Sequence, residues 1–402
     1  MTDMFTPKQE VLLSMFKHDQ LKRINILEGS VRSGKTWISL VLWAFWVATM
    51  PADGAYLMVA KTLTSLKRNC LDLLQTLVGQ KHFTYNTNTK EGRLFGRLIY
   101  LEGVNDARAE NKIRGMTLQG AYCDELTLFT EDFFAMLLSR LSMSGAKLIG
   151  TTNPDNPMHW LKAKYIDRKD KLDMLTMQFL IDDNTMLDPA YVTSLKKEYT
   201  GVFYERFILG KWVVADGVIY DMWQDGYYYD ELPPKMEYAG QYITIDYGTT
   251  NPTAMYYVID DGTRLWVEDE YYYSSQDKRH QLTDKEYADD LEAFIGDRPI
   301  NAIILDPSAA SFRAELASRG IITVNADNDV LDGIRLMASV INLGYLRVNR
   351  KCKRFAQEIV TYSWDSKAAE RGDEKPIKQA DHAMDSIRYL IKRIIKPWRL
   401  TQ

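Results

Sequence analysis

The sequence predicts an α/β protein with two domains, and three observations support this prediction. The chain has 402 residues, which is more than one ordinary hydrophobic core serves. In the first half, short apolar runs alternate with helical stretches, as in a mainly parallel sheet. In the second half, alternating strands joined by a short hairpin turn predict a mixed sheet.

The composition is that of a globular protein, with 46% hydrophobic and 26% charged residues and a net charge of −4. This balance provides no general basic field, so any nucleic-acid binding has to come from local patches. The cysteines Cys70, Cys123 and Cys352 lie far apart and predict a reduced interior. The N-terminus does not read as a signal peptide, and the longest apolar run, residues 37–50, is too short to cross a bilayer. We therefore expect no membrane partner.

A glycine-rich loop near the N-terminus matches G-x-x-x-x-G-K-[ST] and predicts binding of a nucleoside triphosphate. It follows a strand-like run and leads into an apolar helix, and its residues are Gly29, Ser30, Val31, Arg32, Ser33, Gly34, Lys35 and Thr36. Backbone N–H groups at the start of such a helix form a cradle for phosphates. We expect Lys35 to reach the β- and γ-phosphates and Thr36 to bind Mg²⁺. The alternative is a glycine-rich turn that only begins a helix.

Two further features concern the bound nucleotide. Phe5 and Gln9 precede the loop and are candidates for stacking on adenine and bonding its edge. Thr6 and Pro7 also read as the cap and first turn of a helix, so this segment has a purely structural alternative. Arg32 is either a charge-stabilising finger on the transferred phosphoryl group or a surface arginine.

Adjacent acids end a strand expected at residues 121–123. A phosphate-loop enzyme needs one carboxylate for Mg²⁺ and a second to orient the attacking water. Asp124 is the candidate for the first role and Glu125 for the second, unless the pair is only a solvated strand end. Other strands are expected at residues 56–60, 98–101 and 147–154, with a polar helix at 61–77. The last strand ends in hydroxyls and an amide, Thr151, Thr152 and Asn153, a pattern typical of γ-phosphate sensing in translocating ATPases.

The density of Gly, Asp and Pro between residues 215 and 234 marks the domain boundary. We expect a phosphate-loop ATPase domain at residues 1–215, with a small linker subdomain at about 165–215. A linker at 216–238 and a second domain at 239–402 follow.

Three acidic positions in the second half lie at the ends of predicted elements. Asp246 ends an alternating strand, Asp306 ends an apolar strand, and residues 381–385 open a helix that runs to about residue 395. Strand, strand and helix carboxylates that converge on one point are the layout of an RNase H-like nuclease with a two-metal mechanism. Any one of these acids alone could simply cap a loop.

Basic residues concentrate in two places near the C-terminus. The first patch is Arg347, Arg350, Lys351, Lys353 and Arg354, and the second is Arg388, Lys392, Arg393, Lys396 and Arg399. Both could follow a phosphate backbone. The second could equally be the solvated face of an amphipathic helix.

The ordered combination of a phosphate loop, an Asp-Glu strand end, a Thr-Thr-Asn strand end and an acidic triad resembles the large terminase subunit of tailed bacteriophages. The resemblance covers essentially the whole chain. It also rests on the motifs at residues 114–125, 207–212, 246–248, 305–308 and 381–385.

This resemblance implies a DNA-packaging motor. An N-terminal ATPase would drive double-stranded DNA into a procapsid through the portal, and an RNase H-like nuclease would cut the concatemer. Lys35 and Thr36 would bind nucleotide and metal, and Glu125 would be the catalytic carboxylate. The nuclease metals would be held by Asp246, Asp306 and a third ligand shared among Asp381, His382 and Asp385. An imidazole ligand suits Mn²⁺.

The implied cofactors are ATP, Mg²⁺ for the ATPase, and Mg²⁺ or Mn²⁺ for the nuclease. The implied partners are double-stranded DNA, the portal protein, the small terminase subunit and further copies in a ring on the portal. Arg32 would act in cis or from a neighbour. The protein would work in the host cytoplasm, transiently at the procapsid portal vertex, and would be absent from the mature virion.

Two other functions fit parts of the pattern. A helicase-like or repair ATPase would use its C-terminal domain only to bind DNA and would not cut it, whereas cutting that is lost in Asp246→Ala or Asp306→Ala would indicate the nuclease. A nucleotide-gated scaffold would keep its assembly function without the hydrolysis that Glu125 supports.

Overall fold

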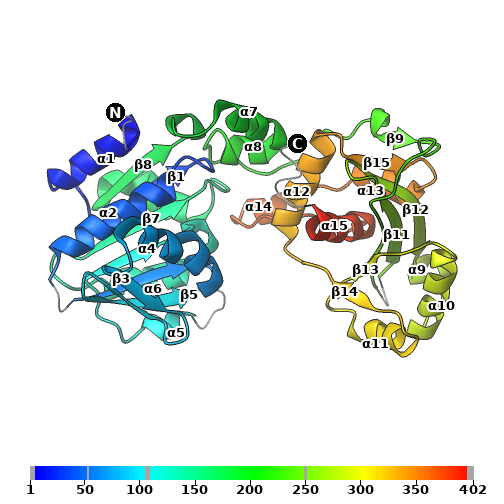
Figure 1. The fold of residues 1–402 in the computed structure, drawn as a ribbon, viewed down its shortest axis with the longest axis horizontal. Coiled ribbons are helices and arrows are strands. Elements are labelled where there is room, and N and C mark those ends of the chain that lie inside the picture. Colours follow the sequence, from blue (N-terminus) through cyan, green and yellow to red (C-terminus); the bar gives the residue numbers. More distant parts are fainter. Residues whose placement is uncertain (1–4, 52–53, 105–108, 249–250, 396–402) are drawn as a thin grey trace. The chain divides into compact units, whose positions relative to one another are not determined.

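The computed structural model describes residues 5–51, 54–104, 109–248 and 251–395, and the chain divides into two compact units (Figure 1). The first unit comprises Met1–Val192, Gly201–Val214 and Glu370–Asp373. The second comprises Thr193–Thr200, Ala215–Ala369 and Glu374–Gln402. The domain limits expected from the sequence stay a prediction.

Within the described residues, the first unit contains an eight-stranded sheet of order β3-β4-β5-β2-β6-β7-β1-β8. Neighbouring strands from β5 to β8 run parallel, and β3 and β4 extend the edge as an antiparallel hairpin. The strands are β1 Ile24–Gly29, β2 Ala55–Ala60, β3 Phe83–Asn86, β4 Glu91–Leu94, β5 Arg97–Gly103, β6 Gly120–Cys123, β7 Lys147–Thr152 and β8 Met174–Phe179. The predicted mainly parallel sheet is confirmed, whereas the hairpin and β8 were not foreseen.

Helices cover both faces of this sheet, because successive strand residues point to opposite sides. Leu27 and Met58 belong to the apolar layer under α1, α2 and α4, while Ile26 and Val59 belong to the layer under α5 and α6. The helices in this part of the chain are α1 Pro7–Lys17, α2 Lys35–Thr49, α3 Leu63–Leu66, α4 Asp72–Val78, α5 Ala109–Ile113, α6 Glu131–Arg140, α7 Pro189–Glu198 and α8 Gly201–Phe207.

The helix expected at residues 61–77 is interrupted. It begins at Leu63, where Thr62 and Ser65 form a reciprocal cap, and a π-helical turn, Lys67–Leu71, separates α3 from α4. The wider turn brings Asn69 to the acidic end of β6, since its side-chain amide lies 3.3 Å from Asp124. Such turns often occur at functional sites.

The described part of the second unit contains a seven-stranded mixed sheet of order β14-β13-β10-β11-β12-β15-β9. Its strands are β9 Tyr228–Tyr229, β10 Gly240–Asp246, β11 Thr253–Asp260, β12 Leu265–Tyr273, β13 Ala302–Leu305, β14 Thr323–Asn325 and β15 Leu346–Asn349. Its helices are α9 Ser275–Lys278, α10 Asp284–Ile295, α11 Ala310–Ser318, α12 Val330–Asn342, α13 Lys353–Ile359, α14 Ser366–Ala369 and α15 His382–Ile394. The mixed sheet agrees with the prediction. The linker expected at 216–238 stays a prediction, and β9 within it pairs with β15.

The second sheet is also covered on both faces. Ile243 and Ile245 pack with Leu291 of α10 and Phe312 of α11. Helix α15 contacts β10 and β11, and the Thr244 hydroxyl donates a 2.6 Å hydrogen bond to the Ser386 carbonyl oxygen. This layering places the start of α15 beside the end of β10.

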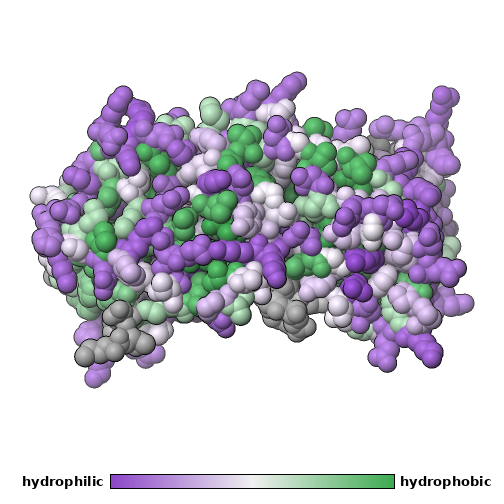
Figure 2. Space-filling model, turned by 90° about the horizontal axis from the view of Figure 1, so that it is seen from above, coloured by the Kyte–Doolittle hydropathy of each residue, from purple (hydrophilic) through white to green (hydrophobic). Residues whose placement is uncertain are grey.

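Two surface properties complete the fold. No helix in the described ranges is long and apolar enough to span a membrane. On the face shown in Figure 2, hydrophilic side chains lie among hydrophobic ones, as is usual because a globular surface always exposes apolar atoms.

Candidate active sites

The phosphate loop lies between β1 and α2, and its glycines are required by geometry. Gly29 has φ +129°, and a Cβ there would lie 2.0 Å from the carbonyl oxygen of Phe179. Gly34 has φ +83° at the N-cap of α2. The N–H groups of Ser30 and Val31 donate to the carbonyls of Phe179 and Phe207 at 2.9 and 2.8 Å. These two donors are therefore used within the protein, and the part of the loop closer to α2 is left to form the phosphate cradle.

Lys35 is buried against the loop that would hold the phosphates. Its Nζ donates to the Ser30 carbonyl oxygen at 2.6 Å and to the Asn153 side-chain oxygen at 3.0 Å. Burial lowers the pKa of Lys35 to about 8, although the Asp124 and Glu125 carboxylates oppose the change. The ammonium group is thus held by neutral oxygens that a phosphate could replace.

The proposed adenine contacts and Arg32 lie next to this loop. The Phe5 ring packs against Trp37 of α2, with centroids 5.5 Å apart. The Gln9 side chain accepts the Thr6 N–H at 3.0 Å, which makes it part of the cap of α1, and it lies against Gly34. Both roles of Gln9 stay open, and its contact with adenine stays a prediction. Arg32 is exposed, and its backbone has the left-handed φ of 55°.

Asp124 and Glu125 follow β6 at the carboxyl edge of the parallel sheet, where β7 separates β6 from β1. Asp124 is 2% exposed, and its two oxygens accept hydrogen bonds from Thr151 at 2.8 Å and Asn69 at 3.3 Å. Glu125 has φ 57°, a strained conformation that is often found at active sites. Its N–H donates to the Thr151 hydroxyl at 3.3 Å, so one side chain orients both acids.

The surroundings of Glu125 make its carboxylate a stronger base. Burial and the neighbouring Asp124 raise the pKa of Glu125, and Lys35 and Arg68 oppose the rise. Asn69 and Arg68 were missed by the sequence analysis. The only sequence signal for them is that they lie in the helical segment after a parallel strand, which begins at the carboxyl edge of the sheet.

The second site begins with the register of two strands. β10 and β13 are parallel neighbours, with Ile245 opposite Leu305. Asp246 and Asp306, one residue further along, therefore leave the sheet at the same edge. This register therefore places the two acids next to each other, which is the arrangement that the sequence predicts.

Helix α15 brings the third element to this edge. His382 is its first residue, and the imidazole Nδ1 lies 2.8 Å from an Asp246 carboxylate oxygen. The Tyr389 hydroxyl lies 3.0 Å from Asp306 and 3.4 Å from Asp246, so it bridges the two strand-end acids. Tyr389 was not singled out from the sequence, although its distance from His382 places it about two turns along the same helix.

The two remaining acids face cations. Asp385 accepts from Arg388 at 2.7 Å and from Lys378 at 3.0 Å, and Lys378 lies 3.2 Å from Asp381. These four residues and His382 line one cavity of about 570 Å³ together with Asp246 and Asp306. The three acidic positions predicted from the sequence therefore share one site.

The environments of the two strand-end acids shift their pKa values in opposite directions. Burial raises the pKa of Asp246, and the hydrogen bond with His382 opposes it. Burial also acts to raise the pKa of Asp306, but hydrogen bonds from Ser308 and Asn328 outweigh it and lower the value. Asp306 is thus the more readily ionised of the pair.

The donor set fits a divalent cation. Carboxylate oxygens are the ligands of Mg²⁺ and Mn²⁺, and an imidazole suits Mn²⁺. Among the described residues, no three His, Cys, Asp or Glu side chains have the spacing of an assembled metal site. The acids are instead bridged by the Tyr389 hydroxyl and neutralised by Lys378 and Arg388. Binding a cation would therefore require these acids to exchange such partners for metal.

Several residues of the two basic patches are paired with acids. In the first, Arg350 pairs with Asp225, Lys351 with Glu268 and Arg354 with Asp277. In the second, the side chains of Arg388 and Lys392 are 2% and 5% exposed and pair with Asp385 and Asp327. These two residues are thus neither free to bind a phosphate backbone nor part of a solvated face. Lys396 and Arg399 lie outside the described residues.

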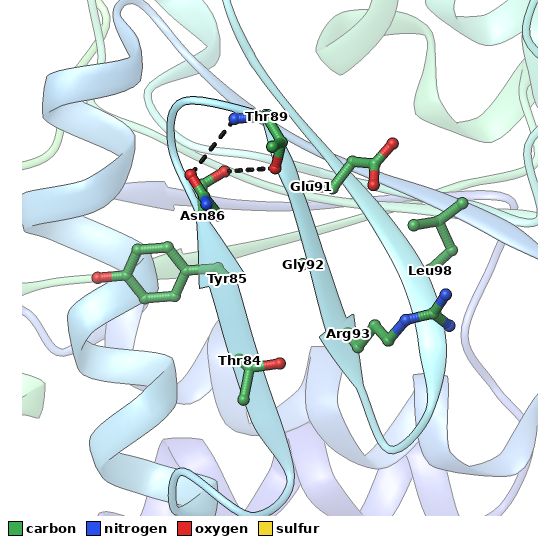
Figure 3. A pocket seen from close by; sticks show the side chains of 8 residues that line it. All are labelled: Thr84, Tyr85, Asn86, Thr89, Glu91, Gly92, Arg93 and Leu98. Carbon is green, nitrogen blue, oxygen red and sulfur yellow. Dashed lines mark hydrogen bonds between the residues drawn. The ribbon is translucent and has the colours of Figure 1, made fainter.

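A second hollow of about 340 Å³ lies on the β3–β4 hairpin (Figure 3). The Thr84, Tyr85, Asn86 and Arg93 side chains are among those that line it. It contains no residue predicted for either site.

Comparison with known proteins identifies the family of the chain. The family model "Terminase large subunit, T4likevirus-type, N-terminal" matches residues 26–223. The large terminase of a thermophilic bacteriophage is 35% identical, with 97% of this chain and 99% of that chain covered and a TM-score of 0.92. A second structure of that thermophilic phage protein, in complex with ADP, has a TM-score of 0.90 with 97% and 99% coverage at 35% identity.

A more distant relative is the large terminase subunit of Escherichia phage T5, which is 28% identical over 156 residues. That alignment covers 38% of this chain and only 35% of the T5 protein. The match to the thermophilic phage protein, in contrast, extends over both halves of the chain, from the phosphate loop to the cavity around Asp246. The chain therefore belongs to the large terminase family of bacteriophage DNA packaging.

Proposed function

We propose that this chain hydrolyses ATP to drive double-stranded DNA into a procapsid and cuts concatemeric DNA with a metal-dependent nuclease. The observation that carries the proposal is the Tyr389 hydroxyl within 3.4 Å of both Asp246 and Asp306. Through it, two strand ends and a C-terminal helix meet at one point, in a chain that also has a complete phosphate loop. The first unit would be the ATPase and the second the RNase H-like nuclease.

The ATPase residues divide into binding and reacting groups. Lys35 would exchange its carbonyl partners for the β- and γ-phosphates, and Thr36 and Asp124 would hold Mg²⁺. Glu125 would accept a proton from the attacking water. Asn153 contacts Lys35 directly, so it is placed to respond when that side chain moves to a phosphate.

The nuclease residues would bind cations from three elements. Asp246, Asp306 and one or more of Asp381, His382 and Asp385 would hold Mg²⁺ or Mn²⁺. Bound divalent cations would supply an activated water and neutralise the leaving 3′ oxygen. The protein holds the acids at one cavity, and the two strand-end carboxylates would release the Tyr389 hydroxyl when they bind the cations.

The partners follow from the motor function. One ATPase cannot hold DNA through its own reset step, so we place several copies in a ring on the portal protein. The exposed Arg32 would then act in its own site or in a neighbour's. The small terminase subunit would bring the DNA, and the work would take place in the host cytoplasm at the procapsid portal vertex. The large terminase of the thermophilic phage was crystallised with ADP and with ATP-γ-S, which supports ATP as the nucleotide.

Plasmid digestion tests the nuclease. Supercoiled plasmid is incubated with wild type, Asp306→Ala or Asp277→Ala in Mg²⁺ or Mn²⁺, and ATP turnover is measured in parallel. Asp277 is an exposed acid of the same unit outside the cavity, so its variant is the matched control. We expect wild type and Asp277→Ala to cut, and Asp306→Ala to hydrolyse ATP without cutting. A wild-type protein that never nicks plasmid would leave a DNA-binding ATPase as the better function.

A further inference from the structure

Glu358 is a buried acid that the proposed reactions do not use. It lies on α13, is 3% exposed, and is not among the residues that line the cavity around Asp246. A buried carboxylate is costly unless hydrogen bonds compensate for the lost water. Burial raises the pKa of Glu358 to about 7, and the backbone N–H groups of Ala383 and Met384 oppose the rise.

The carboxylate of Glu358 takes the place of a missing helix cap. The first N–H groups of a helix have no partner within it, and the N-cap side chain normally accepts one of them. Asp381, the N-cap of α15, makes no such bond and lies 3.2 Å from Lys378 instead. Glu358 Oε2 accepts the N–H of Ala383, the second residue of α15, at 2.6 Å. The cap of this helix therefore comes from a different element.

The acceptor is itself held in position by its own helix. The backbone carbonyl of Glu358 accepts the N–H groups of Thr361 and Tyr362 at 3.0 and 2.8 Å, where α13 ends. At the start of α13, Glu270 of β12 accepts the N–H groups of Arg354 and Phe355 at 2.9 and 3.2 Å. The sheet thus anchors α13, and α13 anchors α15.

The capped turn carries the residues that complete the nuclease site. His382 directly precedes Ala383 and contacts Asp246 at 2.8 Å. Asp385 lies one turn further on and faces the same cavity. A fraying or rotated first turn would move both side chains away from the strand-end acids, because helix position and side-chain direction are coupled.

We propose that Glu358 is a positioning residue for the nuclease site, whose buried carboxylate caps α15 and thereby holds His382 and Asp385 beside Asp246 and Asp306. This role rests on the proposed nuclease function. The important property is a hydrogen-bond acceptor in a fixed place. Glutamine provides such an acceptor, and alanine does not.

The experiment compares full-length wild type, Glu358→Gln, Glu358→Ala and the control Asp277→Ala. Mn²⁺ affinity is measured by titration calorimetry, and amide hydrogen exchange is followed at residues 382–386. ATP turnover reports the integrity of the first unit, and plasmid cutting reports the nuclease. We expect Glu358→Gln and the control to bind Mn²⁺ like wild type. Glu358→Ala should bind about 10-fold more weakly, as is typical when a metal ligand loses its support, with faster exchange at Ala383 and normal ATP turnover.

Several results would overturn the proposal. Wild-type Mn²⁺ affinity in Glu358→Ala would remove the positioning role, and so would an equal loss in Glu358→Gln, which would indicate charge rather than capping. If the alanine variant does not fold, Glu358→Asp is measured in its place. The aspartate side chain is one methylene shorter, so its carboxylate should not reach the N–H of Ala383. If Glu358→Asp leaves the Mn²⁺ affinity and the amide hydrogen exchange unchanged, the positioning role of Glu358 is refuted. A wild type that neither binds Mn²⁺ nor cuts would overturn the nuclease function as well, a result distinct from failure of Glu358 alone.

Discussion

Raising the pH from 7 to 9 should weaken ATP binding through Lys35. In the nucleotide-free protein, burial lowers the pKa of Lys35 to about 8, and Nζ rests on the Ser30 carbonyl and the Asn153 amide oxygen. Phosphates bind the charged ammonium, so above pH 8 each binding event must also take up a proton. The affinity for ATP should therefore be highest well below pH 8 and should fall as the pH rises through that value.

The magnitude follows from the fraction of protonated Lys35. With a pKa of about 8, roughly nine-tenths of the side chains are charged at pH 7 and roughly one-tenth at pH 9. When only a fraction of the protein is competent, the apparent dissociation constant rises by the inverse of that fraction. We expect the dissociation constant to increase about tenfold across this range, which corresponds to about 1.4 kcal/mol.

The assay is equilibrium titration with a fluorescent, slowly hydrolysed ATP analogue and Mg²⁺ at several pH values. Lys35→Ala is the control, because any titration of the nucleotide itself remains in that variant. It should bind weakly, with little change between pH 7 and 9. A pH-independent affinity in wild type, or the same pH dependence in Lys35→Ala, would refute the reasoning.

Three other predictions concern the first unit. Glu125→Gln should bind ATP and stop turnover, as measured by nucleotide titration and phosphate release, and retained turnover would exclude Glu125 as the base. Gly120→Val should lower the free energy of unfolding by about 1–3 kcal/mol in urea, because a Cβ there would lie 2.3 Å from the Trp46 ring; an unchanged midpoint would contradict this contact. Phe5→Ala should weaken ATP binding more than binding of free triphosphate if the Phe5 ring, which lies beside Trp37, stacks on the base; equal losses would mean that Phe5 only packs.

Much of the first site could be predicted from the sequence because its signals are local. Gly29 and Gly34 occupy backbone conformations that other residues rarely adopt, so the loop that needs them has a recognisable spacing. Asp124 and Glu125 end a run of buried residues, and parallel strands end at one edge. The π-helical turn that brings Asn69 to Asp124 has no such signal, because its surroundings come from the packing of α3 on β2 and of the turn itself on α2.

In the second site, the sequence predicted which acids meet but not the side chains that pair with them. Asp246 and Asp306 end recognisable strands, and their meeting depends on the register of β10 and β13. The basic residues were harder to interpret. Arg388 looks like a surface charge in a helical pattern, yet its side chain is 2% exposed and pairs with Asp385.

The sequence by itself determined two local features of this protein: a glycine-rich loop that can surround a phosphate, and acids placed where strands and a helix end. Those features follow from backbone preferences and spacing along a few residues. Only the tertiary structure decided that Lys35 rests on Asn153, that Tyr389 bridges two acids, and that Glu358 caps α15. Each of these contacts joins separate elements, and their geometry is set by strand register and helix packing rather than by local sequence.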